Sequence, residues 1–151
     1  MIRLLFAAVL SMTIGVALPA QAQEKVTFAS MDADLKGGAA TNITGYLYKP
    51  QGAGPFPAVI AMHGCDGLVG QDGKVSPLYG TWGEVLSKEG YVVLLPDSFG
   101  SRGHGSLCAV QPPSARPVQP NREVPRDTYN ARVDVFGAKL VTHRGLVEQK
   151  A

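Results

Sequence analysis

The stretch PFPAVIAMHGCDGL, residues 55–68, contains a wholly apolar run, Ala58–Met62, directly before a histidine, two glycines, a cysteine and an aspartate. Short apolar runs of this kind are typical of strands that are buried on both faces of a parallel sheet. The polar residues crowd together where this strand is expected to end. The loop is therefore a candidate catalytic centre, a metal site, or one wall of a site that other segments complete.

A strand–helix–strand unit is predicted from this stretch onward. Ser76 and Pro77 are typical of an N-cap and a first-turn proline, and Gly90 is typical of a helix end. Tyr91–Leu95 is a second apolar strand, which ends at PDSFGSRGHGS. Strand, helix and strand in this order predict a βαβ unit with a parallel sheet. Apolar residues at helical spacing predict the buried face of the helix, which consists of Leu78, Trp82, Val85 and Leu86.

A hairpin is predicted upstream of this unit. EKVTFAS (residues 24–30) and TNITGYLYKP (residues 41–50) are rich in the β-branched and aromatic residues that strands favour. The segment MDADLKGGAA between them is typical of a turn. Two strands joined in this way predict antiparallel pairing.

A long loop and a helix are predicted downstream. The segment Pro96–Pro125 contains six prolines and no periodic pattern, and long loops of this kind are often functional. The helix after it is predicted to end at His143, Arg144 and Gly145. Its apolar face is expected to consist of Tyr129, Val133, Phe136 and Leu140.

The first 22 residues have the pattern of a secretory signal peptide. Arg3 gives a positive start, Leu4–Leu18 is almost wholly apolar, and Ala20-Gln21-Ala22 is a small-x-small cleavage site. The apolar run is shorter than the roughly 20 residues that a membrane-spanning helix needs. We therefore expect an exported, periplasmic or secreted chain that begins at Gln23, with one domain over residues 23–151.

Composition excludes some classes of partner. The net charge is +2, and the basic residues are scattered without interleaved aromatic residues, so no nucleic-acid partner is expected. No segment after the leader is long and apolar enough to span a membrane. The two cysteines, Cys65 and Cys108, suggest one disulfide in an exported chain.

The loops that follow the two apolar strands carry the candidate site. Ligands bind beyond the carboxyl ends of strands in open α/β sheets, so residues 63–68 and 97–106 are expected to approach each other. PFPAVIAMHGCDGL, GYVVLLPDSFGSRGHGSLC and RVDVFGA together resemble the first half of an exported member of the dienelactone hydrolase family, within the α/β-hydrolase superfamily. The resemblance covers about Thr41 to Ala138. It implies an α/β fold with a partial hydrolase-like sheet: an N-terminal hairpin, a βαβ unit and a further helix.

The resemblance also implies a chemistry. Hydrolases of this family cleave esters or lactones without a metal or other cofactor, through a covalent intermediate. The loop His63-Gly64-Cys65 would supply a backbone N–H to the oxyanion hole, with Cys65 as the expected donor. Arg102 lies near the position where the family places a cation for a substrate carboxylate.

The family also requires a nucleophile on a sharp strand-to-helix turn, in the pattern G-x-S-x-G or its cysteine form. The sequence has no such turn. The pattern needs a glycine two residues before the nucleophile, but Phe99 occupies this position before Ser101 and His63 occupies it before Cys65. The chain is thus expected to end before the nucleophile strand, through an early stop, a frameshift or a sequencing boundary. The strand Ala58–Met62, central in the family, would become an open edge and invite self-association.

Several alternatives remain open for the same residues. Cys65 is either bonded to Cys108 or a nucleophile, and His63 either packs beneath the loop or acts as a base. GSRGHGS is a candidate phosphate loop or an ordinary loop, and His143 is a candidate triad histidine or part of a helix end. No recognised spacing supports the metal set His63, Asp66, Asp97 and His104.

Two functions from different classes follow. The first is an ester or lactone hydrolase by descent. The second is a non-catalytic exported fragment, able to bind a small acid near Cys65 and Arg102. The chemistry of this chain favours the second, because nucleophile, base and orienting acid are all missing.

Overall fold

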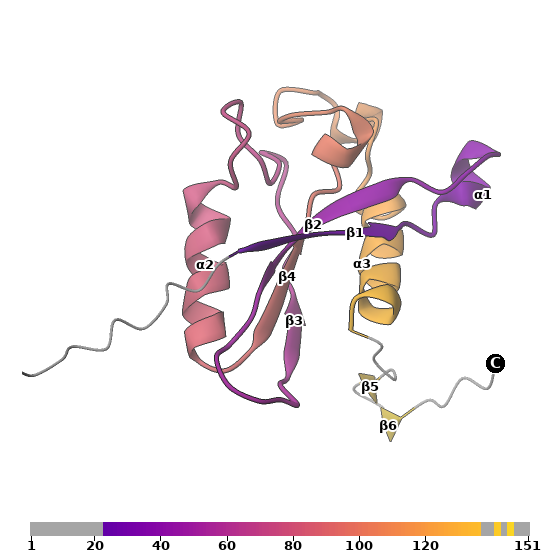
Figure 1. Ribbon diagram of the computed structural model, residues 1–151. Helices are drawn as coiled ribbons and strands as arrows, with labels where there is room; N and C mark the ends of the chain where they lie inside the picture. Colours follow the sequence, from indigo (N-terminus) through magenta and orange to yellow (C-terminus); the bar gives the residue numbers. More distant parts are fainter. Residues whose placement is uncertain (1–22, 137–140, 143–144, 147–151) are drawn as a thin grey trace, which may run out of the picture.

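The computed structural model describes residues 23–136, 141–142 and 145–146 (Figure 1). The predicted signal peptide, residues 1–22, lies outside the described residues, as do His143 and Arg144. No helix within the described ranges is long and apolar enough to cross a membrane.

A four-stranded mixed sheet forms the centre of the molecule. Its strands are β1 (Glu24–Ala29), β2 (Asn42–Tyr48), β3 (Ala58–Ile60) and β4 (Val92–Pro96), in the order β1-β2-β4-β3. β2 pairs antiparallel with both β1 and β4, whereas β3 and β4 are parallel. The predicted hairpin and parallel pair are confirmed, and the architecture is compatible with a partial α/β fold. The connection between β1 and β2 also holds a one-turn helix, α1 (Ala33–Lys36).

Helices cover both faces of the sheet. α2 (Pro77–Lys88) packs on β4 and β2, and α3 (Glu123–Asp134) packs against β1, β3 and β4 from the other side (Figure 1). Strand β4 is buried on both faces because its side chains alternate between two clusters. Leu94 belongs to the cluster with Ala131 of α3, while Val93 and Leu95 belong to the cluster next to α2. This is the environment that an uninterrupted apolar run predicts.

The predicted apolar face of α2 is confirmed only at Leu86, which packs against the core together with Tyr79. Leu78, Trp82 and Val85 are 58%, 55% and 43% exposed, and the buried residues of the helix are Gly83 and Ser87. The cause is close approach: a Cβ at Gly83 would lie 2.7 Å from the ring of Tyr48 in β2. The helix therefore makes its closest approach to the sheet at Gly83, and Leu78, Trp82 and Val85 face outward.

The predicted boundaries of the last helix are wrong. Of its predicted apolar face, Phe136 packs against the core just beyond the helix, and Leu140 lies outside the described residues. α3 begins at Glu123, with Pro125 in its first turn, and ends at Asp134. A proline is tolerated there because first-turn N–H groups have no partner within the helix. Tyr129 and Val133 are 37% and 43% exposed. The buried positions lie four residues apart, at Glu123, Asp127 and Ala131.

The chain after α3 departs from the predicted helix. Val141–Thr142 (β5) and Gly145–Leu146 (β6) pair antiparallel in a small separate sheet. Gly145 therefore belongs to a strand and is not a helix cap.

The proline-rich segment after β4 is more ordered than its sequence predicts. It contains two short 3-10 helices, η1 (Gly100–Arg102) and η2 (Pro113–Ala115). Three of its apolar side chains form a buried cluster of their own: Phe99, Leu107 and Val118.

Strand β3 lies at an edge of the sheet. Among the described strands, β4 is its single neighbour, and its second side is open in the described part of the chain.

Candidate functional site

The loops after β3 and β4 are covalently joined. Cys65 and Cys108 form a disulfide across a sequence separation of 43, with their Cα atoms 4.8 Å apart. The N–H of Leu107 also donates to the carbonyl oxygen of Cys65 at 2.7 Å. The predicted disulfide is therefore confirmed. A bridge across a loop of this length contributes about 4 kcal/mol in the chain-entropy account.

Tyr79 of α2 holds the first loop from the other side. The N–H of Gly64 donates to the Tyr79 hydroxyl at 2.8 Å, and this hydroxyl donates to Oδ1 of Asp66 at 3.0 Å. Burial and the nearby Asp66 carboxylate raise the pKa of Tyr79 above its usual value, although the bond from Gly64 lowers it. The tyrosine therefore stays protonated and able to donate at neutral pH.

Several backbone N–H groups of this loop have no acceptor among the described residues. Within the described ranges, the N–H groups of Cys65 and Asp66 donate no hydrogen bond, while the N–H of Gly67 donates to the carbonyl of Gly64 at 3.3 Å. Gly67 has φ +84°, a conformation that favours glycine. The loop is thus a tight turn that leaves successive donors unused.

The loop after β4 is different, because its donors from Gly100 to His104 are consumed internally. The N–H of Gly100 donates to the Asp97 carboxylate, and that of Ser101 to the Asp97 carbonyl. The N–H groups of Arg102 and His104 both donate to Phe99, and that of Gly103 donates to Gly100. These groups are not available to a phosphate, which argues against the candidate phosphate loop.

His63 packs beneath the first loop. Its Nδ1 donates to the carbonyl of Gly64 at 2.9 Å, and its ring meets Phe99 edge-on with centroids 4.5 Å apart. Nε2 is buried and has no partner among the described atoms. The geometry therefore gives His63 a packing role and pairs it with no nucleophile.

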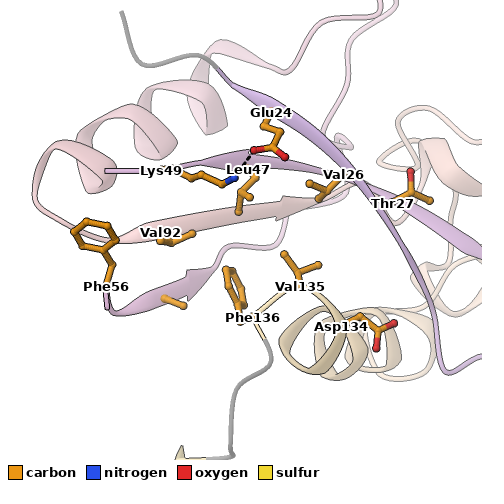
Figure 2. Close-up of a pocket in the computed structure, with 11 residues that line it drawn as sticks. Glu24, Val26, Thr27, Leu47, Lys49, Phe56, Val92, Asp134, Val135 and Phe136 are labelled. Carbon is orange, nitrogen blue, oxygen red and sulfur yellow. Dashed lines mark hydrogen bonds and ion pairs between the residues drawn. The ribbon is translucent and has the colours of Figure 1, made fainter. Parts of the chain in front are cut away.

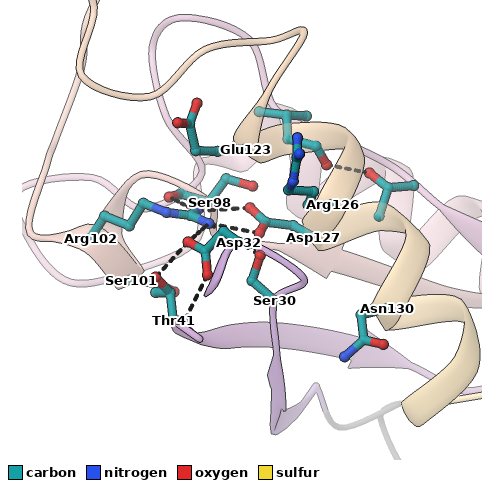
Figure 3. A network of polar contacts seen from close by, with 12 residues as sticks. Ser30, Asp32, Thr41, Ser98, Ser101, Arg102, Glu123, Arg126, Asp127 and Asn130 are labelled. Carbon is teal, nitrogen blue, oxygen red and sulfur yellow. Dashed lines mark hydrogen bonds and ion pairs between the residues drawn. The ribbon is translucent and has the colours of Figure 1, made fainter. Parts of the chain in front are cut away.

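Arg102 lies in a buried ionic cluster rather than in an open site (Figure 3). Its NH1 and NH2 groups donate to the two carboxylate oxygens of Asp127 at 2.8 Å each, and NH2 also donates to Asp32 at 2.8 Å. The side chain of Arg102 is 5% exposed, and those of both aspartates are fully buried. The expected contact with a substrate carboxylate does not fit this geometry, because two protein carboxylates already occupy the guanidinium.

The charges of this cluster shift the pKa values of Asp32 and Arg102. Burial raises the pKa of Asp32, but the two bonds from Thr41 and the contact with Arg102 outweigh it and lower the pKa from 3.8 to about 2. Burial lowers the pKa of Arg102, yet its bonds to Asp127 and Asp32 raise it overall. Asp32 and Arg102 therefore stay charged at neutral pH.

Sequence reasoning missed Asp32 and Asp127. Asp32 lies in a segment that was predicted to be a turn, and Asp127 lies off the predicted apolar face of α3. One signal was available: Glu123, Asp127 and Ala131 share a helical face at intervals of four residues. A polar stripe is usually solvated, so the pattern alone did not indicate burial.

A cavity of about 670 Å³ lies at the opposite end of the sheet, beside the first residues of β3 and β4 (Figure 2). Ala58, Val92 and Phe136 line it, and the exposed ion pair of Glu24 with Lys49 stands at its side. It lies far along the strands from the disulfide loop and shares no residue with it.

The described residues hold neither a free thiol nor a metal cluster. Both cysteines are in the disulfide, so Cys65 is not a nucleophile in this state. No group of three or more histidine, cysteine, aspartate or glutamate side chains within the described ranges is placed to hold a metal ion.

A scan of the chain against models of known protein families finds no match, and a search of curated proteins finds none either. The resemblance to dienelactone hydrolases therefore stays a prediction.

Proposed function

We propose that this chain carries the oxyanion loop of an ester or lactone hydrolase, and that the N–H groups of Cys65 and Asp66 bind the oxygen that becomes negative in acyl transfer. The observation that carries the proposal is the contrast between the two loops. All five N–H groups from Gly100 to His104 donate within the protein, whereas those of Cys65 and Asp66 do not.

Rigidity of the loop supports this role. Donors lower a reaction barrier when they are already oriented toward the developing charge, so that no reorganisation is needed. The disulfide holds the loop at Cys65, and Tyr79 holds it at Gly64 and Asp66. The two free donors lie between these three attachments.

The chemistry assigned to the loop is electrostatic. When a nucleophile attacks the carbonyl carbon of an ester or lactone, the carbonyl oxygen takes up the electron pair, and two N–H donors stabilise it. Removal of one such donor typically lowers kcat by about 100- to 1000-fold. The resemblance supplies the substrate class, and the loop supplies one wall of the site.

A second candidate function is carbonyl or anion binding without turnover. One observation favours it for this chain: the sulfur of Cys65 is bonded to Cys108 and cannot attack a substrate. Binding of an acid at Arg102 is no longer part of this alternative, since Asp32 and Asp127 hold that side chain.

A binding experiment tests the proposed loop. Ethyl phenylphosphonate has a tetrahedral phosphorus with a negatively charged oxygen, and ethyl benzoate is its planar neutral counterpart. In ¹H–¹⁵N spectra of the purified chain, the phosphonate is expected to shift the amides of Cys65 and Asp66 and to leave those of Ser101 and His104 unchanged. Ethyl benzoate should bind more weakly, because it lacks the charge.

Tyr79→Phe removes the hydroxyl that holds the loop. We expect it to weaken phosphonate binding about fivefold, because a net hydrogen bond contributes about 1 kcal/mol. Tyr91→Phe changes a tyrosine that is 37% exposed and serves as the matched control. If the phosphonate shifts neither amide, the loop is no oxyanion site.

A turnover assay separates the two functions. We expect the chain to hydrolyse p-nitrophenyl acetate no faster than its Cys65→Ala/Cys108→Ala variant, because oxyanion donors alone give only residual acceleration. Robust turnover that a single substitution abolishes would reveal a nucleophile and establish the chain itself as an enzyme.

A further inference from the structure

The N–H groups of Cys65 and Asp66 belong to two different peptide units. The N–H of Cys65 shares a planar unit with the carbonyl of Gly64, and the N–H of Asp66 shares one with the carbonyl of Cys65. Both units are trans, because the cis bonds within the described residues precede Pro55 and Pro112. In a trans unit the N–H points opposite to the C=O. Whatever holds each carbonyl therefore sets the direction of the donor.

The carbonyl of Gly64 is held from within its own loop. It accepts a hydrogen bond from Nδ1 of His63 at 2.9 Å and another from the N–H of Gly67 at 3.3 Å. Both bonds join residues of the loop after β3. The direction of the Cys65 N–H is therefore set inside this loop.

The carbonyl of Cys65 is held from the loop after β4. It accepts the N–H of Leu107 at 2.7 Å and the hydroxyl of Ser106 at 3.4 Å. Tyr79 does not replace this support, because it bonds to the side chain of Asp66, which can rotate relative to the peptide unit. The direction of the Asp66 N–H therefore depends on where the chain at Leu107 lies.

The disulfide is the strong link that keeps Leu107 at this carbonyl. Cys108 follows Leu107 directly and is bonded to Cys65. The side chain of Leu107 is buried with Phe99 and Val118, so it is anchored to a cluster of its own loop. Without the sulfur–sulfur bond, one backbone N–H and one hydroxyl at 3.4 Å are the hydrogen bonds that still join the two loops among the described residues.

The disulfide is also accessible to a reductant. Cys108 and its neighbours Ser106 and Ala109 are exposed, and Cys65 is half-buried. Exposed disulfides are the labile and regulatory ones. A dithiol attacks one sulfur as a thiolate, and its second thiolate then releases the mixed disulfide. Two electrons pass to the protein, each cysteine takes up a proton to become a thiol, and the reductant becomes a disulfide.

We propose that the disulfide between Cys65 and Cys108 is a redox switch of the oxyanion loop. In the oxidised chain, Leu107 holds the Cys65 carbonyl and both donors are fixed. Reduction by a dithiol frees the segment at Leu107, so the Asp66 N–H loses its fixed direction while the Cys65 N–H keeps it. The inference rests on the oxyanion role proposed above and adds its regulation.

The phosphonate experiment, repeated with oxidised and with reduced dithiothreitol, tests the switch. In the oxidised chain, ethyl phenylphosphonate should shift the amides of Cys65 and Asp66. In the reduced chain, Cys65 should keep its shift and Asp66 should lose most of it. The affinity should fall about tenfold, because one hydrogen bond to a charged oxygen is lost. Unchanged signals of Ser101 and His104 should show that the chain stays folded.

Two variants separate the bond from the reductant. Cys108→Ala breaks the same disulfide and should reproduce the reduced state with either form of dithiothreitol. Ala109→Ser, at the exposed neighbouring position, keeps both cysteines and is the matched control. It should bind the phosphonate as the wild-type chain does and still respond to reduction.

Amide hydrogen exchange gives a readout that needs no ligand. The N–H of Leu107 is bonded to Cys65 in the oxidised chain and should exchange about tenfold faster after reduction, through local opening. The N–H of Gly67 bonds within its own loop and should exchange equally in both states.

The outcomes distinguish the switch from the function that it regulates. If the phosphonate shifts no amide in either state but Leu107 loses protection on reduction, the conformational switch stands and the oxyanion role fails. Equal exchange of Leu107 in both states overturns the switch, as does a bound phosphonate whose affinity is the same in both. A reduced chain that unfolds also overturns it, because the disulfide is then a staple of the whole fold.

Discussion

Asp32 joins the hairpin to the rest of the molecule through one buried carboxylate. Its oxygens accept the backbone N–H and the hydroxyl of Thr41 at 2.8 and 2.7 Å, and one of them also accepts Arg102 at 2.8 Å. Removing one partner of a buried ion pair is strongly destabilising, because the other charge is left without compensation. The cluster therefore holds α3 and the loop after β4 against the hairpin.

The lowered pKa of Asp32 predicts acid sensitivity. Its folded-state pKa of about 2 lies below the usual 3.8, so the stabilisation is fully present above pH 3.8 and is lost as the pH falls toward 2. The difference corresponds to about 2 kcal/mol of unfolding free energy. Urea unfolding between pH 2 and 6 should show this loss, and Asp32→Asn should remove this part of it.

Asp72→Asn is the matched control, because Asp72 is exposed and accepts only a local bond from the N–H of Lys74. It should leave the pH dependence unchanged. An identical acid profile for the wild-type chain and Asp32→Asn would contradict the assigned cause.

At the scale of elements, α2 is positioned by its glycines. A Cβ at Gly83 would lie 2.7 Å from the ring of Tyr48, whereas at Gly80 the nearest such atom, the Tyr48 hydroxyl oxygen, is 3.6 Å away. Both positions are glycine, so helix propensity is the same at each and only the surrounding atoms differ. Their substitutions separate the effect of contact from the effect of propensity.

Gly83→Ala and Gly80→Ala are expected to change stability in opposite directions. Alanine at position 80 should stabilise the fold by up to about 1 kcal/mol, because glycine is the poorer helix former. Alanine at position 83 should destabilise it by about 1–3 kcal/mol, because the helix must move off the sheet. Urea unfolding of both variants measures the difference, and a stabilising Gly83→Ala would show that α2 does not approach Tyr48 so closely.

At the scale of the whole molecule, the disulfide is compatible with an oxidising compartment. The leader pattern and the disulfide are independent observations, one from the first residues and the other from the folded domain. The disulfide is compatible with the export that the leader pattern predicts.

Export is expected to yield a chain that begins at Gln23 with both cysteines oxidised. Intact mass spectrometry of periplasmic or secreted material measures both features. Ala20→Leu should block processing, since the cleavage site requires a small residue there, and Ala17→Leu in the apolar run should not. Recovery of only the full-length chain from the cytoplasm would contradict the signal peptide.

The sequence by itself determined the elements of the sheet and one covalent link. β4 was recognisable because a strand buried on both faces must be apolar throughout, and α2 because Ser76, Pro77 and Gly90 mark its ends. The disulfide followed from two cysteines on loops at one end of a parallel pair. Each of these inferences depends on local pattern or on simple sheet geometry.

Only the tertiary structure decided which face each helix buries and where Arg102 finds its partners. Periodicity reports which residues are apolar, but burial also depends on shape, and Gly83 fits over Tyr48 where Trp82 does not. Arg102 pairs with carboxylates 70 and 25 residues away, whose proximity no local pattern encodes. A charge can be buried only where folding brings an opposite charge next to it, and only the three-dimensional structure shows where that happens.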